Sequence, residues 1–401
     1  MKILYISSTS AGMHDHGIYY DLLKEFSNQG HNVTIVYARE KRQNKDTELY
    51  TYSRMTYLGI KTMNTTKNKN FVEKTASILS IDRLFANAIK KHLEFESYDL
   101  VLYSTPPITF KETLKYFKNK GSILYLMLKD IFPQNGADIG LFRENGIIYK
   151  FFKRKEKFLY SISDHIGVMS QANKEYFIIH NPEFKEKVSI LPNALNISEN
   201  PLKSKRSDFD LNETDLILIY GGNLGKPQGV DFIVECIRKL ETLKNVTLLI
   251  CGEGSESSKI SDVIRDESIK NTTYLGSLET ERYNNLAKLV DVGLIFLDNR
   301  FTIPNYPQRV LSYMEAEIPI ISATDVVTDI GTDAVRNKYG FSITNESTTE
   351  WLDAVTFLKN NPEQRVEMGK SGRRYLLENF NVQKNCEKII EVYEKIKGGI
   401  K

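Results

Sequence analysis

A glycine-rich segment near the middle of the chain has the residues of an anion-binding loop. The apolar run Leu216–Tyr220 is interrupted by Gly221–Gly229, after which apolar residues return at helical spacing. A strand that breaks into glycines and restarts as a helix presents unpaired N–H groups at a positively polarised helix end. This pattern predicts a phosphate contact, and a tight turn without a ligand is the alternative. The candidate residues are Gly222, Asn223, Gly225, Lys226 and Gln228.

A second loop has a similar composition. The segment Cys251-Gly-Glu-Gly follows another apolar run, and its glycines let the backbone approach a ligand closely. A purely structural turn is the alternative. The candidate residues are Gly252, Glu253 and Gly254.

The N-terminal half also has titratable residues at the ends of predicted strands. The loop Gly12–Ile18 follows the first strand, and Asp130 follows the strand Ser122–Leu128. Open α/β sheets bind ligands at the carboxyl ends of their strands, so Asp130 is placed to accept a proton from a hydroxyl group. His16 is placed to orient a hydroxyl or a phosphate. Helix capping is the alternative role for both side chains. The loop adds Gly12, His14 and Gly17 as candidates.

Alternating strands and helices position these loops. Apolar runs and helical periods follow one another through both halves of the chain, which is typical of parallel sheets covered by helices on both faces. The polar segment Asn196–Asp210 looks like a linker. We therefore predict two doubly wound, Rossmann-like α/β domains facing across a cleft, over residues 1–198 and 208–379. A helix over about 380–401 is expected to pack back on the first domain. The strands are expected at Ile3–Ser7, Val33–Tyr37, Asp99–Ser104, Ser122–Leu128, His165–Met169, Val188–Leu191, Leu216–Tyr220, Val246–Cys251, Thr273–Leu275, Val292–Phe296 and Pro319–Ser322. The polar region that follows Tyr37, up to Asn70, is expected to be a loop with one extended piece around Arg54–Ile60.

The composition excludes several other classes of protein. The 401 residues carry a formal net charge of +3, which is too small to indicate a nucleic-acid partner. The three cysteines and six histidines show no zinc-ligand spacing, so we expect no metal. The first residues are too short an apolar run for a signal peptide, and no run is long enough to span a membrane. The expected location is the cytoplasm. The sequence does not define an oligomeric state.

Seven blocks, in order, resemble the retaining glycosyltransferases of family four, which have the GT-B fold. They cover essentially the whole chain. Within the family the nearest resemblance is to the capsule and O-antigen branch, and in particular to an L-N-acetylfucosamine transferase. The blocks are Lys2–Ser7 and Gln29–Val36, Tyr103–Ile108, Lys129–Gln134, Val168–Asn173, Ile190–Asn196, Tyr220–Gly229 and Pro304–Pro319.

The resemblance implies a hexosyltransferase that takes a UDP-sugar donor. Thr273–Leu278 resembles the strand end that holds the nucleotide base, and the helix near Pro307 occupies the place of the donor-binding helix. A leaving diphosphate can be stabilised without a metal by a helix N-terminus and a cation. The helix is expected to begin near Pro307, as its first residue, and to direct unpaired N–H groups at the ligand. Arg309 and Lys226 are the candidate cations. The implied donor contacts include Gly276, Leu278, Tyr306, Pro307, Gln308 and Arg309.

Some positions depart from the family pattern. Pro304 and Ser312 stand where the family has two glutamates, and Asn223 and Gln228 replace an arginine and a lysine. These changes leave the sugar and ribose contacts undefined, although Glu315 lies one turn beyond Ser312. They also keep two other functions open, a nucleotide-sugar epimerase of the same fold and a non-catalytic nucleotide-sugar-binding subunit. Only an epimerase should turn over the donor without an acceptor.

The segment Tyr149–Tyr160 combines aromatic residues with five cations. A cationic amphipathic helix can rest on an anionic membrane surface, and a half-buried helix with a solvated face is the alternative. The resemblance implies an acceptor sugar linked to undecaprenyl diphosphate. We therefore expect a peripheral protein on the inner face of the cell membrane, transferring an N-acetylated hexosamine, with a 6-deoxy sugar as the narrower expectation.

Overall fold

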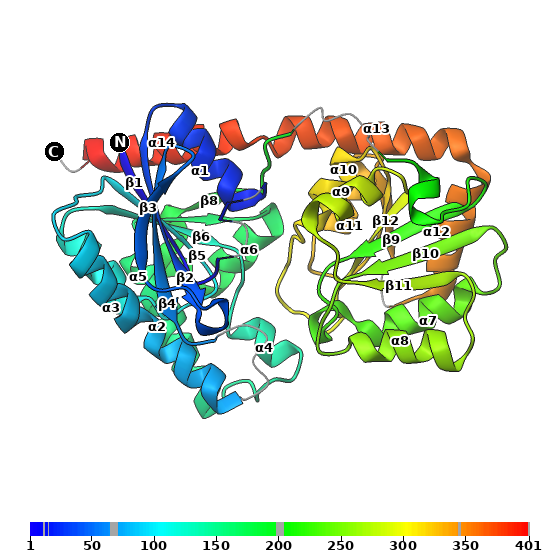
Figure 1. Ribbon diagram of the computed structural model, residues 1–401, viewed down its shortest axis with the longest axis horizontal. Coiled ribbons are helices and arrows are strands. Elements are labelled where there is room, and N and C mark those ends of the chain that lie inside the picture. Colours follow the sequence, from blue (N-terminus) through cyan, green and yellow to red (C-terminus); the bar gives the residue numbers. More distant parts are fainter. Residues whose placement is uncertain (11–12, 15, 65–70, 198–203, 344–345, 400–401) are drawn as a thin grey trace. The chain divides into compact units, whose positions relative to one another are not determined.

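The computed structural model describes residues 1–10, 13–14, 16–64, 71–197, 204–343 and 346–399. The predicted site residue Gly12 lies outside the described residues. The chain forms two compact units, one of residues 1–196 with 381–401 and one of residues 197–380. Each unit is a parallel sheet between helices (Figure 1). The prediction of two doubly wound α/β domains is therefore confirmed.

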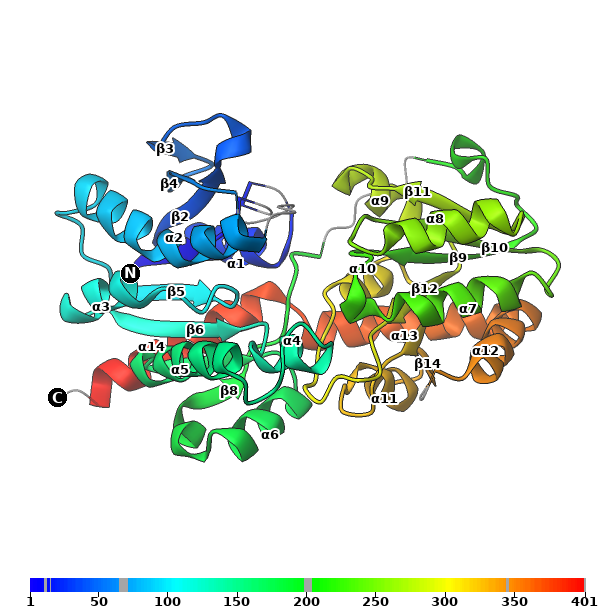
Figure 2. The ribbon, with the colours of Figure 1, turned by 90° about the horizontal axis from the view of Figure 1, so that it is seen from below.

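The sheet of the first unit has eight strands in the order β3-β4-β2-β1-β5-β6-β7-β8 (Figure 2). All neighbours are parallel except β3 and β4, which form an antiparallel hairpin. The strands are β1 (Lys2–Ser7), β2 (Asn32–Glu40), β3 (Glu48–Tyr52), β4 (Met55–Thr62), β5 (Leu100–Ser104), β6 (Ile123–Leu128), β7 (His165–Val168) and β8 (Val188–Ile190).

Helices cover both faces of this sheet. The helices are α1 (Ile18–Asn28), α2 (Phe71–His92), α3 (Lys111–Asn119), α4 (Gln134–Asp138), α5 (Ile147–Ile162), α6 (Gln171–His180) and the last helix of the chain, α14 (Val382–Gly399). Helices α1 and α14 lie side by side on one face (Figure 1) and share one apolar core with the strands. Leu22 and Phe26 of α1 meet Cys386 and Ile389 of α14 in this core.

The second unit has six parallel strands in the order β11-β10-β9-β12-β13-β14. This is the strand order of dinucleotide-binding folds, in which the order of the strands along the sheet reverses between β9 and β12. The strands are β9 (Leu216–Gly221), β10 (Val246–Cys251), β11 (Thr272–Gly276), β12 (Val292–Phe296), β13 (Ile320–Ala323) and β14 (Gly340–Ile343). The helices are α7 (Val230–Leu240), α8 (Ser257–Asp266), α9 (Thr280–Ala287), α10 (Arg309–Glu315), α11 (Ile330–Arg336), α12 (Thr348–Asn360) and α13 (Pro362–Asn379).

The apolar strands explain why these sheets are buried on both sides. Every residue of β9 is buried; Leu216, Leu218 and Tyr220 join the core beneath α7, and the residues between them face the opposite side. A strand buried on both faces needs a continuous apolar run, as the sequence has here.

Two elements differ from the prediction. The polar region before residue 70 was expected to be a loop with one extended piece near Arg54–Ile60, but it contains the β3–β4 hairpin. Its first strand is largely exposed, so it lacks the apolar run that marks the central strands. The short strand β14 was not predicted, because its four residues include Gly340 and a solvent-facing Ser342.

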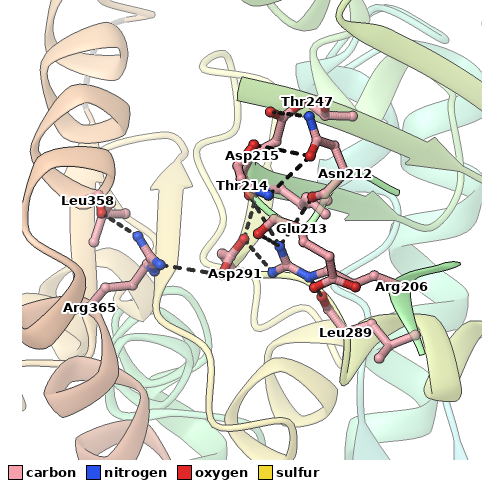
Figure 3. A network of polar contacts seen from close by, with 11 residues as sticks. Arg206, Asn212, Glu213, Thr214, Asp215, Thr247, Leu289, Asp291, Leu358 and Arg365 are labelled. Carbon is pink, nitrogen blue, oxygen red and sulfur yellow. Dashed lines mark hydrogen bonds and ion pairs between the residues drawn. The ribbon is translucent and has the colours of Figure 1, made fainter. Parts of the chain in front are cut away.

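A polar network fixes the start of the second unit to the amino ends of its strands (Figure 3). Asp291, just before β12, accepts a hydrogen bond from the Ile217 main chain and forms ion pairs with Arg206 at 2.8 Å and Arg365 at 3.5 Å. Arg206 also donates to the carbonyls of Asp215 and Leu289. Arg206 is therefore anchored at the opposite edge of this sheet from the predicted ligand loops.

None of the helices in the described ranges combines the length and apolar character needed to cross a membrane.

Candidate functional site

The glycine-rich loop after β9 packs directly against the loop after β10. The Gly222 N–H donates to the Cys251 carbonyl at 3.0 Å, and the Leu224 N–H donates to the Glu253 carbonyl at 3.0 Å. Gly252 has φ +134°, and a Cβ there would lie 1.7 Å from the Gly222 carbonyl oxygen. Both loops therefore depend on glycine, and the structure brings the two predicted loops together at the carboxyl edge of the sheet.

The β11 end joins the same edge. The Gly252 N–H donates to the Gly276 carbonyl at 2.7 Å, and the Tyr274 hydroxyl donates to the Gly252 carbonyl at 2.8 Å. Leu278, two residues further, is half-buried. The predicted base-binding segment thus continues the row of loops at this edge.

Asn223 and Gln228 pair with each other within the glycine-rich loop. The Asn223 amide donates to the Gln228 side-chain oxygen at 2.9 Å, and the Gly225 N–H donates to the same oxygen at 3.2 Å. Gln228 is buried, whereas Asn223 and Lys226 are exposed. The two residues that replace the family's cations therefore hold the loop in shape, and Lys226 is the cation that this loop presents to solvent.

Arg309, the first residue of α10, lies against this loop. Its guanidinium group stacks on the Tyr220 ring at 4.7 Å from the centroid, and a Cβ on Gly222 would lie 2.6 Å from its Nη2. Its Nη1 is buried and has no hydrogen-bond partner within the described part of the chain. Burial by itself would lower the pKa of Arg309, but Tyr220 and Tyr313 outweigh it and raise this pKa above its ordinary value. A permanent positive charge therefore lies directly beside the Gly222 backbone.

Two tyrosines that the sequence analysis did not identify fix α10 over the β9–β12 reversal. The Tyr313 hydroxyl donates to the Ile219 carbonyl at 3.3 Å and accepts from the Gly221 N–H at 3.2 Å. The Tyr283 hydroxyl of α9 donates to that of Tyr313 at 3.4 Å. Tyr313 lies one helical turn beyond Arg309, so this spacing was a usable signal. No local pattern indicates Tyr283.

The start of α10 differs from the expectation. The helix begins at Arg309 with Gln308 as its N-cap, so Pro307 precedes it. The N–H groups of Val310 and Leu311 already donate to the carbonyls of Pro307 and Gln308. These first-turn donors, which were expected to be unpaired, are used within the chain, so the Arg309 side chain becomes the main anion-attracting feature of this segment.

The Tyr306 side chain is mainly packed inside the second unit. It is 3% exposed, its ring lies 5.7 Å from that of Phe380, and its hydroxyl donates to Asp333 at 3.5 Å. The side chain therefore presents little surface to a ligand.

Asp325, another residue that the sequence analysis missed, orders the segment before α10. It is buried at the carboxyl end of β13, and it accepts hydrogen bonds from the Thr328 N–H and hydroxyl at 2.8 and 2.9 Å. The Thr328 hydroxyl oxygen in turn accepts from the Asn305 N–H at 3.0 Å. Burial raises the pKa of Asp325 to about 6.

In the first unit, His16 is oriented by a buried carboxylate. Its Nδ1 lies 2.8 Å from Oδ2 of Asp21, which is 5% exposed. Asp21 also accepts from the Asn196 and Gly17 main chains at 2.8 and 3.4 Å. Gly17 is the N-cap of α1, and no side chain caps this helix. His16 is therefore held by Asp21 and does not take the alternative role of a helix cap.

His14 lies in an aromatic cluster. Its ring stacks on Tyr57 at 4.8 Å, and its Nε2 lies 2.7 Å from the Tyr50 hydroxyl. Tyr50 belongs to the hairpin strand β3. This strand, which was not predicted, therefore contacts the loop between β1 and α1.

Asp130 lies just after β6 at the carboxyl edge. The Thr105 hydroxyl, just after β5, donates to the Asp130 carbonyl and accepts from the Asp130 N–H, both at 3.0 Å. The next helix begins at Gln134 with Pro133 as its N-cap, so Asp130 is not a helix cap. Burial raises the pKa of Asp130 to about 7 and lowers that of Lys129 to about 7.

Each unit thus gathers its predicted residues at the carboxyl edge of its own sheet, where α/β proteins bind nucleotides. In the described ranges, no group of three or more histidine, cysteine and acidic side chains has the arrangement of a metal site. The class defined by this fold and these loops is a two-domain α/β protein with Rossmann-like parallel sheets.

Comparison with known proteins makes the class more specific. Residues 203–375 match the family described as "Glycosyl transferases group 1". The probable glycosyltransferase WbjE of Pseudomonas aeruginosa is 22% identical over 66% of this chain and 66% of its own length. The poly(ribitol-phosphate) alpha-N-acetylglucosaminyltransferase of Staphylococcus aureus is 24% identical over 60% of this chain and 47% of its own length. The matches therefore span less than two thirds of these curated relatives.

Solved structures resemble the whole chain. Sucrose-phosphate synthase from Thermosynechococcus elongatus matches with a TM-score of 0.79 at 13% identity, covering 100% of both chains. Anabaena HepE in complex with UDP matches with a TM-score of 0.69 at 13% identity, covering 98% of this chain and 100% of its own. At sequence identities this low, the similarity to these structures shows a shared fold only. The chain has the GT-B fold, and its residues 203–375 match the group 1 glycosyltransferases.

Proposed function

We propose that this protein is a metal-independent, retaining glycosyltransferase of family four. It transfers an N-acetylated hexosamine from a UDP-sugar to a sugar linked to undecaprenyl diphosphate, in capsular or O-antigen polysaccharide biosynthesis. L-N-acetylfucosamine, a 6-deoxy sugar, is the narrower proposal for the transferred group. The group 1 match over residues 203–375 supports the reaction class. The names of the relatives, which include an N-acetylglucosaminyltransferase, support a hexosamine donor.

The observation that carries the proposal is the position of Arg309. A buried guanidinium nitrogen without a partner favours a nearby negative charge, because an uncompensated buried cation is costly. Gly222 has no side chain between the guanidinium group and the loop. A diphosphate bound on this loop would supply that charge. During transfer, negative charge grows on the leaving diphosphate, so a fixed cation stabilises the transition state more than the ground state.

The acceptor belongs with the first unit in this proposal. Asp130, whose pKa of about 7 suits proton transfer near neutrality, would accept the proton of the acceptor hydroxyl. His16, held through Nδ1 by Asp21, would orient that hydroxyl or a phosphate. UDP is favoured as the nucleotide because the GT-B structure of HepE was solved with UDP. The cytoplasmic face of the membrane, contacted through Tyr149–Tyr160, is the proposed location.

A thermal-shift titration with nucleotides tests the donor site, because a ligand that binds the folded state raises the melting temperature. We expect UDP and UDP-sugars to stabilise the protein, with or without EDTA. Arg309→Ala should weaken UDP binding by roughly 10- to 100-fold, since a hydrogen bond to a charged group contributes about 1.5–3 kcal/mol. Arg309→Lys should lose less, because it retains the charge.

The matched control is Arg374→Ala, which removes an exposed arginine from α13. It should leave the UDP response unchanged. A response to GDP alone would contradict the UDP donor, and an unchanged UDP affinity in Arg309→Ala would remove Arg309 from the site.

A further inference from the structure

A hollow of about 310 Å³ opens between α3 and α5 of the first unit, and the loop that leads from β5 to α3 also lines it. The two helices pack against each other on the face of the sheet opposite α1 and α14 (Figure 1). The residues that line the hollow are Ile108, Thr109, Lys111, Phe151, Arg154, Lys155 and Phe158. It therefore combines three cations with apolar walls.

The three cations have no acidic partner within the ranges that the structure describes. Other cations of α5 do: Lys153 pairs with Glu156 and Lys157 pairs with Glu183. The Lys111 ammonium lies 5.9 Å from the Phe158 ring centroid, and the Lys155 ammonium lies 5.1 Å from that of Phe151. Lys111, Arg154 and Lys155 are thus three of the cations of α3 and α5 that lack an acidic partner in the described ranges, and all three line the hollow.

The exposed face of α5 beside the hollow is apolar. Phe151, which lines the hollow, is 44% exposed, and Ile147 and Ile148, about one turn before it on α5, are 90% and 50% exposed. The opposite side of α5 is fixed in the unit, because Tyr149, Glu156, Leu159 and Tyr160 are buried. Exposed apolar side chains beside uncompensated cations are the features of a surface that lies in the interfacial region of an anionic bilayer.

We propose that the hollow between α3 and α5 binds the phosphate group of an anionic phospholipid, and that Ile147, Ile148 and Phe151 enter the bilayer interface beside it. Lys111, Arg154 and Lys155 surround the phosphate, and charge-assisted hydrogen bonds from three directions suit its oxygen atoms. The inference rests on the membrane location in the proposed function. It extends that location from a basic segment of α5 to a defined headgroup site that includes α3.

Vesicle flotation tests this site with the full chain. We expect binding to phosphatidylcholine vesicles that contain phosphatidylglycerol, little binding to phosphatidylcholine alone, and a decrease with added salt. Each cation near an anionic surface contributes about a five-fold factor, so K111A/R154A/K155A should bind roughly 100-fold more weakly. Ile147→Ser with Phe151→Ser should also weaken binding, because it removes the apolar contact.

The matched control removes the same charge elsewhere. Lys91, Lys239 and Lys270 are exposed, and their triple alanine variant should lose less than about five-fold. An equal loss in the control, or equal binding to both vesicle types, would overturn the headgroup site. Stabilisation by inorganic phosphate that depends on the three cations, without vesicle binding, would assign the hollow to free phosphate and overturn the lipid proposal.

The UDP thermal shift is measured on the same variants and should be unchanged in K111A/R154A/K155A. If the protein bound vesicles but did not respond to UDP, the proposed donor site would be wrong while the headgroup site would stand.

Discussion

At the scale of single residues, the site is defined by charges whose environments differ from water. Arg309 keeps its positive charge in a partly buried setting, because the effects of Tyr220 and Tyr313 on its pKa outweigh that of burial. Asp130 is instead driven towards its neutral form, because burial penalises the carboxylate. The first arrangement suits a permanent electrostatic role, and the second suits a group that exchanges a proton near neutral pH.

Asp130 should make stability depend on pH. Its pKa is raised from 3.8 to about 7, so between these values the folded state binds a proton that the unfolded state has lost. Stability should therefore fall as pH rises from about 4 to 7. Asp130→Asn should remove this contribution, leave the smaller one of Asp325, and be more stable than the natural protein at pH 8, by up to about 4 kcal/mol. Urea unfolding at several pH values measures the difference.

Asp353→Asn, which changes an exposed carboxylate, is the control for this series. Its stability should vary with pH as that of the natural protein does. If Asp130 is the proton acceptor, transfer activity should also rise with pH through about 7 and lose that rise in Asp130→Asn. A stability difference independent of pH would contradict the raised pKa.

At the scale of elements, the ligand edge of the second unit consists of loops that brace one another. The β9 loop bonds to the β10 loop, and the β10 loop bonds to the end of β11. Where the β9 and β10 loops touch, their backbones leave no room for a side chain at Gly252 or Gly254. The arrangement should therefore be sensitive to the smallest added side chain, but only where two backbones touch.

Gly252→Ala and Gly276→Ala separate contact from backbone strain. A Cβ at Gly252 would lie 1.7 Å from the Gly222 oxygen, whereas one at Gly276 (φ +65°) would meet nothing within 4 Å. We expect Gly276→Ala to cost about 1–2 kcal/mol of unfolding free energy, from the left-handed backbone alone. Gly252→Ala should cost about 3 kcal/mol or more, and it should weaken UDP binding. Equal losses in denaturant unfolding would show that the loops are not in contact.

At the scale of the whole molecule, the chain returns to its first unit at the end. Helix α14 belongs to the unit of residues 1–196, although it follows the whole second unit in sequence. Its core contacts with α1 include Cys386, whose thiol donates to the Leu22 carbonyl at 3.6 Å. The core of the first unit is therefore complete only when α14 has docked on α1.

Ile389→Ala tests this dependence. Ile389 is fully buried in the core shared with α1, so the variant should lose about 2–5 kcal/mol from the first unit. The second unit should keep its response to UDP. Calorimetry with and without UDP distinguishes the two effects, and Lys388→Ala, on the exposed side of α14, is the control. Loss of UDP binding in Ile389→Ala at temperatures where the second unit is folded would contradict the division.

The sequence by itself determined the elements and the class of fold. Strands such as Val246–Cys251 and Val292–Phe296 were predicted with the bounds they have, because a strand buried on both faces needs a local apolar run that is visible without knowledge of its partners. The glycine loops were found for the same reason, since a glycine pattern at a strand end is also local. The exposed strand β3 was missed because it has no such run.

Only the tertiary structure decided which side chains meet. The contacts of Arg309 with Tyr220 and Gly222 join residues nearly ninety positions apart, and the hollow between α3 and α5 joins two helices from separate segments. Local periodicity contains no information on such pairs, because they depend on strand order and helix packing. A sequence pattern shows which residues of a segment must be buried. Only the folded chain determines whether a buried charge lies beside a partner of opposite charge.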